Sequence, residues 1–289
     1  MAETHWNKLG AYLKETQILG SIQNTLYWDQ NTGMPKKGAS WRSEQLTYIA
    51  KVLHERNSSE EFSNLIQSAK NELADIERNS DNQLFIKDKE RNISLLLKEF
   101  NRERNLDPKL VESLAKAKSK GYESWQEAKE KSDFKIFLPF FEELVKLRIE
   151  EAKQISIQCS PWETLAQPFE PELNLKWLNK IFQPLKETIP GLIRGINKSQ
   201  KNHWDLSPES QKNLCSKLLD EFGRDRDLVV VGQSPHPFSI TLGPNDFRIT
   251  TRIVEGEPLS SFLATAHEWG HSIYEQGLPS QSHQWFAWP

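Results

Sequence analysis

The sequence predicts a mainly α-helical protein with a small β-sheet near its C-terminal end. Apolar residues follow helical periodicity through residues 1–223, and β-branched runs separated by Gly, Pro and Asn replace this pattern in residues 224–257. Helical spacing returns over residues 258–277. Of the 289 residues, 37% are hydrophobic, so a sizeable core can form. No internal repeat or low-complexity segment divides the chain, and we expect residues 1–289 to belong to one domain.

The helices of the first part are indicated by periodic apolar residues and by the residues at their ends. In residues 41–56 the apolar side chains recur every three or four positions, which is the spacing of one helix face. Residues 107–131 open on Asp107 and Pro108, a pair that favours the start of a helix. The same criteria predict helices over residues 92–106, 137–155, 175–189 and 207–223.

The last part of the chain combines short strands with one final helix. Residues 227–258 predict two or three strands, and the helix then runs from about Pro258 to Gln276. Gly277 stands where a helix commonly ends on a left-handed glycine. We expect the helix to bury an apolar stripe, with the histidines beside that stripe. The stripe is formed by Leu259, Phe262, Leu263, Ala266, Gly270 and Ile273.

The composition excludes several classes of function. A net charge of −3 gives no electrostatic reason to bind nucleic acid or an anionic membrane. No run of about 18 apolar residues is present, so we expect no transmembrane helix. The initial MAETHWNKLG lacks the basic and apolar regions of a secretion signal, and two cysteines do not make a disulfide framework. We therefore expect a cytoplasmic protein with no nucleic-acid or membrane partner.

Residues 264–279, ATAHEWGHSIYEQGLP, contain the pattern His-Glu-x-x-His on the predicted final helix. Residues four apart share a helix face, so His267 and His271 can direct both imidazoles at one ion. Zinc accepts neutral imidazole nitrogen, and a catalytic zinc takes three protein ligands plus water. The side chain of Glu268 points to the side where that water would sit, so its carboxylate can serve as general base. The pattern predicts a catalytic zinc site, and the alternative is a chance match with packed histidines.

A third zinc ligand is not evident within the chain. Glu275 lies one turn beyond His271, too far along the helix axis to join the two histidines. His283 follows His271 by twelve residues, which does not fit the shorter spacing of the extended metzincin motif. The third ligand is most simply placed beyond Pro289.

Four stretches resemble the Taq-type thermostable metallocarboxypeptidases. AHEWGHSIYEQGLP (266–279) is similar to the active-site helix of that family, and PHPF (235–238) and DFRITT (246–251) resemble its HPF and DxRxT motifs in the expected order. LYWDQNTGMPKKGASWRSEQL (26–46) resembles its WDQ…MP segment and the helix that follows. The resemblance covers nearly the whole chain.

The resemblance implies a multi-helix, zincin-type peptidase with a long groove and a small β-sheet next to the zinc helix. The implied activity is release of C-terminal amino acids from peptides with a free C-terminus, with zinc as the metal and cobalt or manganese as substitutes. A homodimer is implied for the full-length form. His267 and His271 become metal ligands and Glu268 the catalytic residue. The implied groove residues are His236, Pro237, Phe238, Asp246, Arg248 and Thr250.

The chain departs from this family at its end. Family members continue beyond this point and supply a glutamate as third ligand from a following helix, so the resemblance implies that residues 1–289 are the N-terminal portion of the peptidase domain. A zinc oligopeptidase or endopeptidase, and a catalytically inactive truncated helical fragment, remain alternative functions. On the residues alone, Asp246 and Arg248 lie on one face of a strand and favour a surface ion pair. Trp28 and Asp29 are interpreted as structural.

Overall fold

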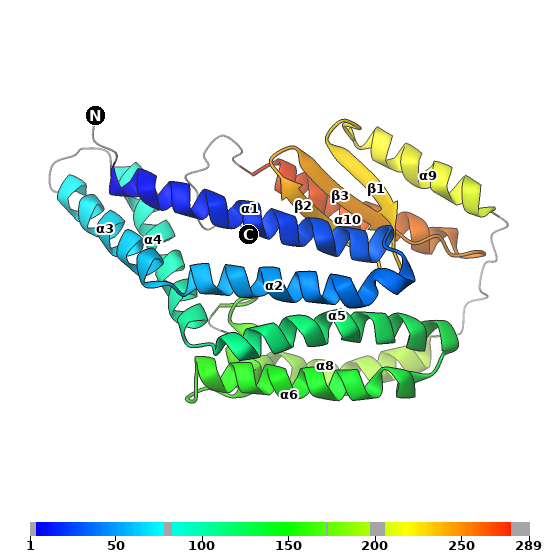
Figure 1. Cartoon of the computed structure of the whole chain (residues 1–289). Coiled ribbons are helices and arrows are strands. Elements are labelled where there is room, and N and C mark those ends of the chain that lie inside the picture. The colour runs from blue at the N-terminus through cyan, green and yellow to red at the C-terminus, as the bar shows by residue number, and fades with distance from the viewer. Residues whose placement is uncertain (1–3, 78–82, 172, 197–205, 279–289) are drawn as a thin grey trace.

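The computed structural model describes residues 4–77, 83–171, 173–196 and 206–278, and this part of the chain is mainly helical with one small sheet (Figure 1). The α-helices are α1 (His5–Thr32), α2 (Ala39–Asn57), α3 (Glu60–Glu77), α4 (Gln83–Arg104), α5 (Pro108–Lys131), α6 (Leu138–Ile155), α7 (Pro161–Ala166), α8 (Leu175–Gly195), α9 (Pro208–Glu221) and α10 (Pro258–Gln276). The strands are β1 (Val229–Gln233), β2 (Ser239–Gly243) and β3 (Asp246–Thr251). The predicted fold class is confirmed.

Capping residues define both ends of α5, and those at its start are the ones that the sequence indicated. The Asp107 carboxylate accepts a hydrogen bond from the backbone N–H of Lys109, and Pro108 occupies the first turn, where its missing N–H removes no helical bond. The helix ends at Lys131, and the C-cap residue Ser132 has a φ of 53°, which lies in the left-handed region. The helix predicted over residues 107–131 is therefore confirmed.

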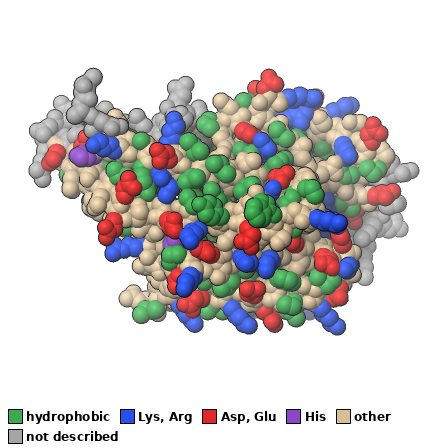
Figure 2. Space-filling model, viewed as in Figure 1, with side chains coloured by type: hydrophobic (Ala, Val, Ile, Leu, Met, Phe, Trp, Pro, Cys, Tyr) green, Lys and Arg blue, Asp and Glu red, His purple; other side chains and the backbone are tan. Residues whose placement is uncertain are grey.

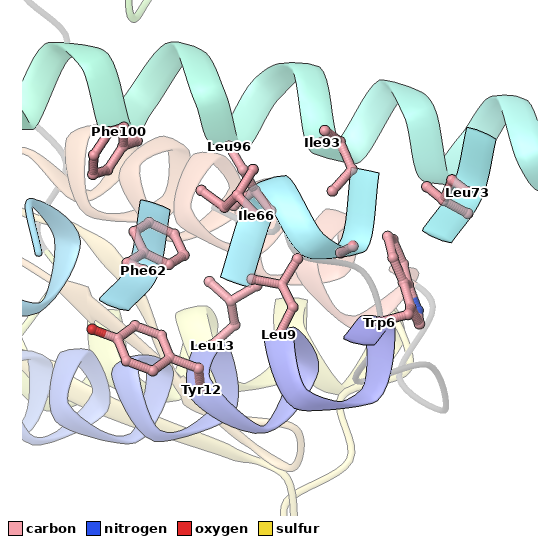
Figure 3. Close-up of a cluster of buried hydrophobic side chains, with 11 residues drawn as sticks. Trp6, Leu9, Tyr12, Leu13, Phe62, Ile66, Leu73, Ile93, Leu96 and Phe100 are labelled. Carbon is pink, nitrogen blue, oxygen red and sulfur yellow. The ribbon is translucent and has the colours of Figure 1, made fainter. Parts of the chain in front are cut away.

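The larger hydrophobic core lies between α1, α3 and α4 (Figure 3). Leu9 from α1 and Ile66 from α3 are completely buried, and Phe62 stacks on Tyr12 at a ring separation of 5.3 Å. Phe100 from α4 meets Phe62 edge to face at 6.0 Å. This core fixes one end of the long α1, and the other end of α1 reaches the sheet.

The sheet has the strand order β1-β3-β2, with β1 parallel and β2 antiparallel to the central β3. α9 and α10 pack on it through a second core that includes Leu219, Ile249 and Trp269. α1 covers the β2 edge, where the Ser21 hydroxyl donates to the carbonyl of Leu242 and the Asn24 amide donates to that of Thr241. Figure 1 shows α10 alongside these strands.

The buried face of α10 differs from the prediction. Leu259, Leu263 and Ile273 of the expected stripe are 52%, 63% and 47% exposed. The side that packs on the sheet is largely polar instead, and its buried residues are Pro258, Ser261, Thr265, Glu268, Trp269 and Ser272. Small hydroxyl side chains let the helix approach β3 closely, and Thr265 satisfies its hydroxyl at 2.8 Å from that of Thr251.

The end of α10 also differs in detail from the expectation. The helix stops at Gln276 as predicted, but Gly277 has φ −80° and remains in the right-handed region. Its N–H donates to the carbonyls of Ile273 and Tyr274 at 3.0 and 3.1 Å. A left-handed glycine is therefore not what ends this helix.

Charges of both signs are interspersed over the face of the molecule seen in Figure 2, with hydrophobic side chains between them. No helix among the described residues is both long and apolar enough to cross a membrane.

Gly232 on β1 lies against α1 so closely that a side chain does not fit. A Cβ at this position would approach two ring carbons of Trp28 at 2.9 and 3.0 Å. We expect Gly232→Ala to lower the free energy of unfolding by about 1–3 kcal/mol, because Trp28 is buried against Phe238 and Arg248 and has little room to move away. Urea denaturation measures the change. Gly243→Ala on β2 is the control, since a Cβ there meets nothing within 4 Å, and equal destabilisation of both variants contradicts the prediction.

Candidate active site

His267 and His271 lie one turn apart on the exposed side of α10 and point toward the same position. Their Nε2 atoms are 3.2 Å apart, and their rings are nearly perpendicular, at 88° with centroids 4.8 Å apart. Helix α10 sets this arrangement through its own geometry, because residues i and i+4 are neighbours on its surface. The convergence of the two imidazoles follows directly from their spacing in the sequence.

This arrangement fits two ligands of one zinc ion. Imidazole nitrogens bind zinc at about 2.0–2.1 Å, so two of them on a tetrahedral ion lie about 3.3 Å apart. The observed separation of 3.2 Å is close to that value. Without a metal, one Nε2–H can donate to the other ring, which requires opposite tautomers on the two histidines. The pair is thus prearranged for a shared proton or a shared cation.

Glu268 is 7% exposed and lies on the buried side of the same turn. Burial raises the pKa of its carboxyl, while the nearby His267, His271 and His236 act in the opposite direction. A carboxylate that is partly desolvated and surrounded by imidazoles is a suitable acceptor for a proton from water. His236 therefore belongs to the electrostatic surroundings of Glu268 although it comes from a different element.

The loop that carries His236 is held to β3 by hydroxyl groups. Thr250 is completely buried, and its hydroxyl accepts a hydrogen bond from the N–H of Phe238 at 2.9 Å. The hydroxyl of Ser234 lies 2.6 Å from that of Thr250 and donates to the carbonyl of His236 at 2.6 Å. The HPF and DxRxT motifs are thus physically connected, and Thr250 fixes the path of the loop next to Glu268.

Aromatic residues of α1 support the loop from the other side. Phe238 meets Tyr27 and Trp28 edge to face at centroid distances of 5.5 and 5.7 Å. Trp28 also contacts Gly232 and lies 5.5 Å below the guanidinium of Arg248. Trp28 therefore has a structural role, and it connects α1 with both motifs.

Asp246 and Arg248 form a two-pronged ion pair with each other. Nε and Nη2 of Arg248 donate to the two carboxylate oxygens of Asp246 at 2.7 and 2.8 Å. The pair lies toward the start of β3, and neither side chain bonds to a residue of α10. Here the structure contains the local ion pair that the spacing of the two residues favoured.

No pattern in the sequence indicated that residues of α5 lie near the HPF loop (residues 235–238). The ammonium of Lys129 donates to the carbonyl of Pro235 at 3.2 Å and lies over the ring of Trp125. Tyr122 is close to Tyr27, and burial, together with that neighbour, raises the pKa of Tyr122 to about 12. These contacts join segments about a hundred residues apart, so no local pattern could have indicated them.

The described residues contain no group of three His, Cys, Asp or Glu side chains arranged to hold a metal ion. Glu275 has a different partner, because Thr241 donates a hydrogen bond to the Glu275 carboxylate. Burial raises the pKa of Glu275. His283 lies outside the described residues. His267 and His271 are therefore a pair without a third ligand in this part of the chain.

An open cavity of about 790 Å³ lies between α1, α4, β2 and the end of α10. Ser21, Glu99, Leu242 and Glu275 are among its lining residues, whereas His267 and His271 are not. The cavity begins one turn beyond the histidines and gives the molecule a concave surface next to α10.

Thr250 offers a test of the connection between the two motifs. We expect Thr250→Val to destabilise the protein by about 1–3 kcal/mol, because the N–H of Phe238 loses its side-chain acceptor and the hydroxyl of Ser234 loses one of its two partners. Urea denaturation measures the loss. Thr25→Val is the matched control, because that hydroxyl is exposed and bonds only within its own helix. Equal stability of the two variants would show that Thr250 does not hold the loop.

Comparisons with known proteins agree with this architecture. The chain is 29% identical to thermostable carboxypeptidase 1 of Thermus thermophilus over 96% of its own length and 56% of the relative, and 30% identical to carboxypeptidase 1 of Bacillus subtilis over 88% and 50%. The BsuCP crystal structure superposes with a TM-score of 0.84 at 28% identity, covering 95% of this chain and 55% of the other. Trypanosoma cruzi metallocarboxypeptidase 1 gives 0.77 at 25% identity, covering 97% and 56%. The chain thus spans about half the length of these relatives.

The family itself is recognised over almost the entire sequence. A sequence profile of the carboxypeptidase Taq (M32) metallopeptidases matches residues 8–288, a range that includes the HPF loop, β3 and α10. The chain belongs to the carboxypeptidase Taq (M32) family of metallopeptidases.

Proposed function

We propose that this chain supplies two metal ligands and the general base of a zinc-dependent metallocarboxypeptidase. The observation that carries the proposal is the pair of Nε2 atoms 3.2 Å apart, one helix position from the buried carboxylate of Glu268. Membership of a metallopeptidase family and the carboxypeptidase names of the relatives support it. The third ligand is proposed to be a glutamate beyond Pro289.

The residues of α10 divide the chemistry between them. His267 and His271 would hold the ion, for which cobalt or manganese could substitute. Zinc at such a site lowers the pKa of water and polarises a carbonyl. Glu268 accepts the proton of the attacking water and afterwards delivers it to the leaving amine. His236, whose loop is fixed by Thr250, keeps a polar group beside Glu268.

The proposed substrates are peptides with a free C-terminus. The proposed groove residues are His236, Pro237, Phe238, Asp246, Arg248 and Thr250. The loop and β3 contacts support a shaping role for this set, because they hold the loop against α1 and next to α10. We also propose a single domain, a cytoplasmic location and a homodimer for the full-length form.

Blocking the C-terminus of a test peptide distinguishes the candidate functions. The zinc-loaded protein is expected to release the last residue of a peptide with a free carboxylate and to lose most of its rate when that carboxylate is an amide. Equal cleavage of both peptides favours an endopeptidase or oligopeptidase. Cleavage of neither peptide, with zinc bound, favours a catalytically inactive fragment.

A further inference from the structure

The backbone of the HPF loop has few hydrogen-bond donors. Pro235 and Pro237 stand on either side of His236, and proline has no backbone N–H. Bonds to the carbonyl groups of the loop therefore contribute much of what fixes its path. Phe238, at the end of the loop, is held by Thr250 through both its N–H and its carbonyl. Pro235 and His236, at the start of the loop, need other partners.

Two side chains supply partners for the carbonyl groups at the start of the loop. The hydroxyl of Ser234 donates to the carbonyl of His236 at 2.6 Å. The ammonium of Lys129 donates to the carbonyl of Pro235 at 3.2 Å, although the two residues are 106 positions apart. Ser234 is adjacent to the loop in the sequence, whereas Lys129 belongs to the last turn of α5. Lys129 thus connects a distant helix with the backbone immediately before His236.

The surroundings of Lys129 leave its ammonium available for the loop. Glu127, the acidic residue two positions earlier, pairs with Lys131 at 2.6 Å instead. Among the described residues, no carboxylate forms an ion pair with Lys129. The ring of Trp125, one turn earlier on α5, lies 4.9 Å from the ammonium, a distance at which a cation is attracted to an aromatic face. Trp125 therefore helps to hold the ammonium where the carbonyl of Pro235 accepts its hydrogen bond.

Helix α5 is a firm support for this contact. It packs on both α2 and α6, and it lies between them in Figure 1. Helix α1 is bonded to it as well, because the amide of Gln30 donates to the buried hydroxyl of Ser119 at 3.1 Å. Lys129 itself is exposed and adds little to this packing. The contact with Pro235 therefore transmits the position of α5 to the loop, while α5 keeps its place without it.

His236 is the residue whose position this contact fixes. Its imidazole is one of three that act on the carboxyl of Glu268, and it is the one that does not come from α10. We propose that Lys129 is a positioning residue of the active site, because by holding the carbonyl of Pro235 to α5 it keeps the imidazole of His236 beside Glu268. Lys129 acts through the loop and is not itself a catalytic residue. Its effect on hydrolysis rests on the proposed function, whereas its effect on the loop does not.

Direct binding of the substrate is the competing role for Lys129. Its ammonium is exposed, and burial together with the neighbouring Arg252 lowers the pKa of Lys129. Two neighbouring cations suit the free carboxylate of a peptide. The contact with Pro235 favours the positioning role, because the ammonium would have to give up that hydrogen bond to meet a substrate.

The test compares Lys129→Met, which removes the ammonium, with Lys129→Arg, which keeps a cation at this position. In Lys129→Met we expect the nuclear magnetic resonance signals of the His236 ring to shift. We also expect the N–H of Phe238 to exchange with solvent at least about threefold faster, because a loosened loop opens more often. Lys129→Arg is expected to restore both. Lys131→Met is the matched control, since Lys131 is exposed and pairs with Glu127 on its own helix.

Kinetics of the active, zinc-loaded protein add a second readout. Lys129→Met is expected to lower kcat about three- to tenfold, which is the effect of losing one hydrogen bond, and to leave KM and zinc affinity nearly unchanged. Added to His236→Ala, the same substitution is expected to lower kcat no further, because it acts only through that imidazole. A purely structural role for Lys129 would lower kcat equally in both backgrounds.

Several results would overturn the proposal. These are unchanged ring signals of His236 and unchanged exchange of Phe238 in Lys129→Met, changes of the same size in Lys131→Met, or a loss of kcat that persists in the His236→Ala background. A rise in KM confined to peptides with a free C-terminus, with unmoved His236 signals, would overturn it as well and assign Lys129 to substrate binding. If no peptide is hydrolysed, the proposed function fails, and the signals of His236 still decide whether Lys129 holds the loop.

Discussion

Glu268→Gln is expected to lower the rate of peptide hydrolysis by about 10²–10⁴-fold in the active, zinc-loaded protein, which is the usual contribution of a general acid–base group. The amide keeps the size and the buried position of the side chain but cannot accept a proton from water. Metal binding is expected to remain, because the imidazoles of His267 and His271 converge independently of that carboxylate. Steady-state hydrolysis of a peptide with a free C-terminus, together with zinc content, measures both effects.

Glu275→Gln provides the control on the same helix. Glu275 is also partly buried, but it bonds to Thr241 and lies beyond the histidines. Its replacement is expected to leave the rate nearly unchanged. Turnover by Glu268→Gln at the rate of Glu275→Gln would remove Glu268 from the mechanism.

His271→Ala is expected to weaken zinc binding more than about 100-fold. Loss of an outer partner of a metal ligand already costs about 10–100-fold, and His271 is proposed as a ligand itself. Hydrolysis is expected to disappear with the metal, because Glu268 then has no activated water to deprotonate. Competition with a chromogenic chelator measures the affinity.

His236→Ala is the control for His271→Ala. It distinguishes the effect of losing a zinc ligand from the effect of losing any imidazole near Glu268. His236 influences Glu268 from the loop before β2 but does not share the convergence of the α10 pair. Its removal is expected to leave zinc affinity close to that of the unchanged protein. Zinc binding by His271→Ala as tight as by His236→Ala is incompatible with a metal site on α10.

The sequence predicted those features that depend on neighbours along the chain. The spacing of His267 and His271 sets their convergence, because both lie on one continuous helix. Asp107 and Pro108 indicated the start of α5 by chemistry confined to one turn. Strands and helix near the C-terminus followed in the predicted order, since turn residues and periodicity mark them locally.

Features that depend on distant segments could not be predicted in this way. The apolar residues of α10 suggested a buried stripe, but the side packed on β3 carries hydroxyl groups that find partners there, such as Thr265 with Thr251. Lys129 reaches the carbonyl of Pro235 across 106 residues. Trp28 fits against a glycine of β1 that no periodic pattern connects with α1. Each case depends on which surfaces meet in the fold.

Anomalous diffraction at the zinc absorption edge, from crystals of the protein grown with zinc, tests directly whether His267 and His271 bind one metal ion. We expect a single strong anomalous peak within bonding distance of Nε2 of both His267 and His271, adjacent to the carboxylate of Glu268. At saturating zinc, the absence of a peak at these nitrogens would contradict a metal site on α10. A structure in which the two imidazoles are hydrogen-bonded to each other would contradict it as well.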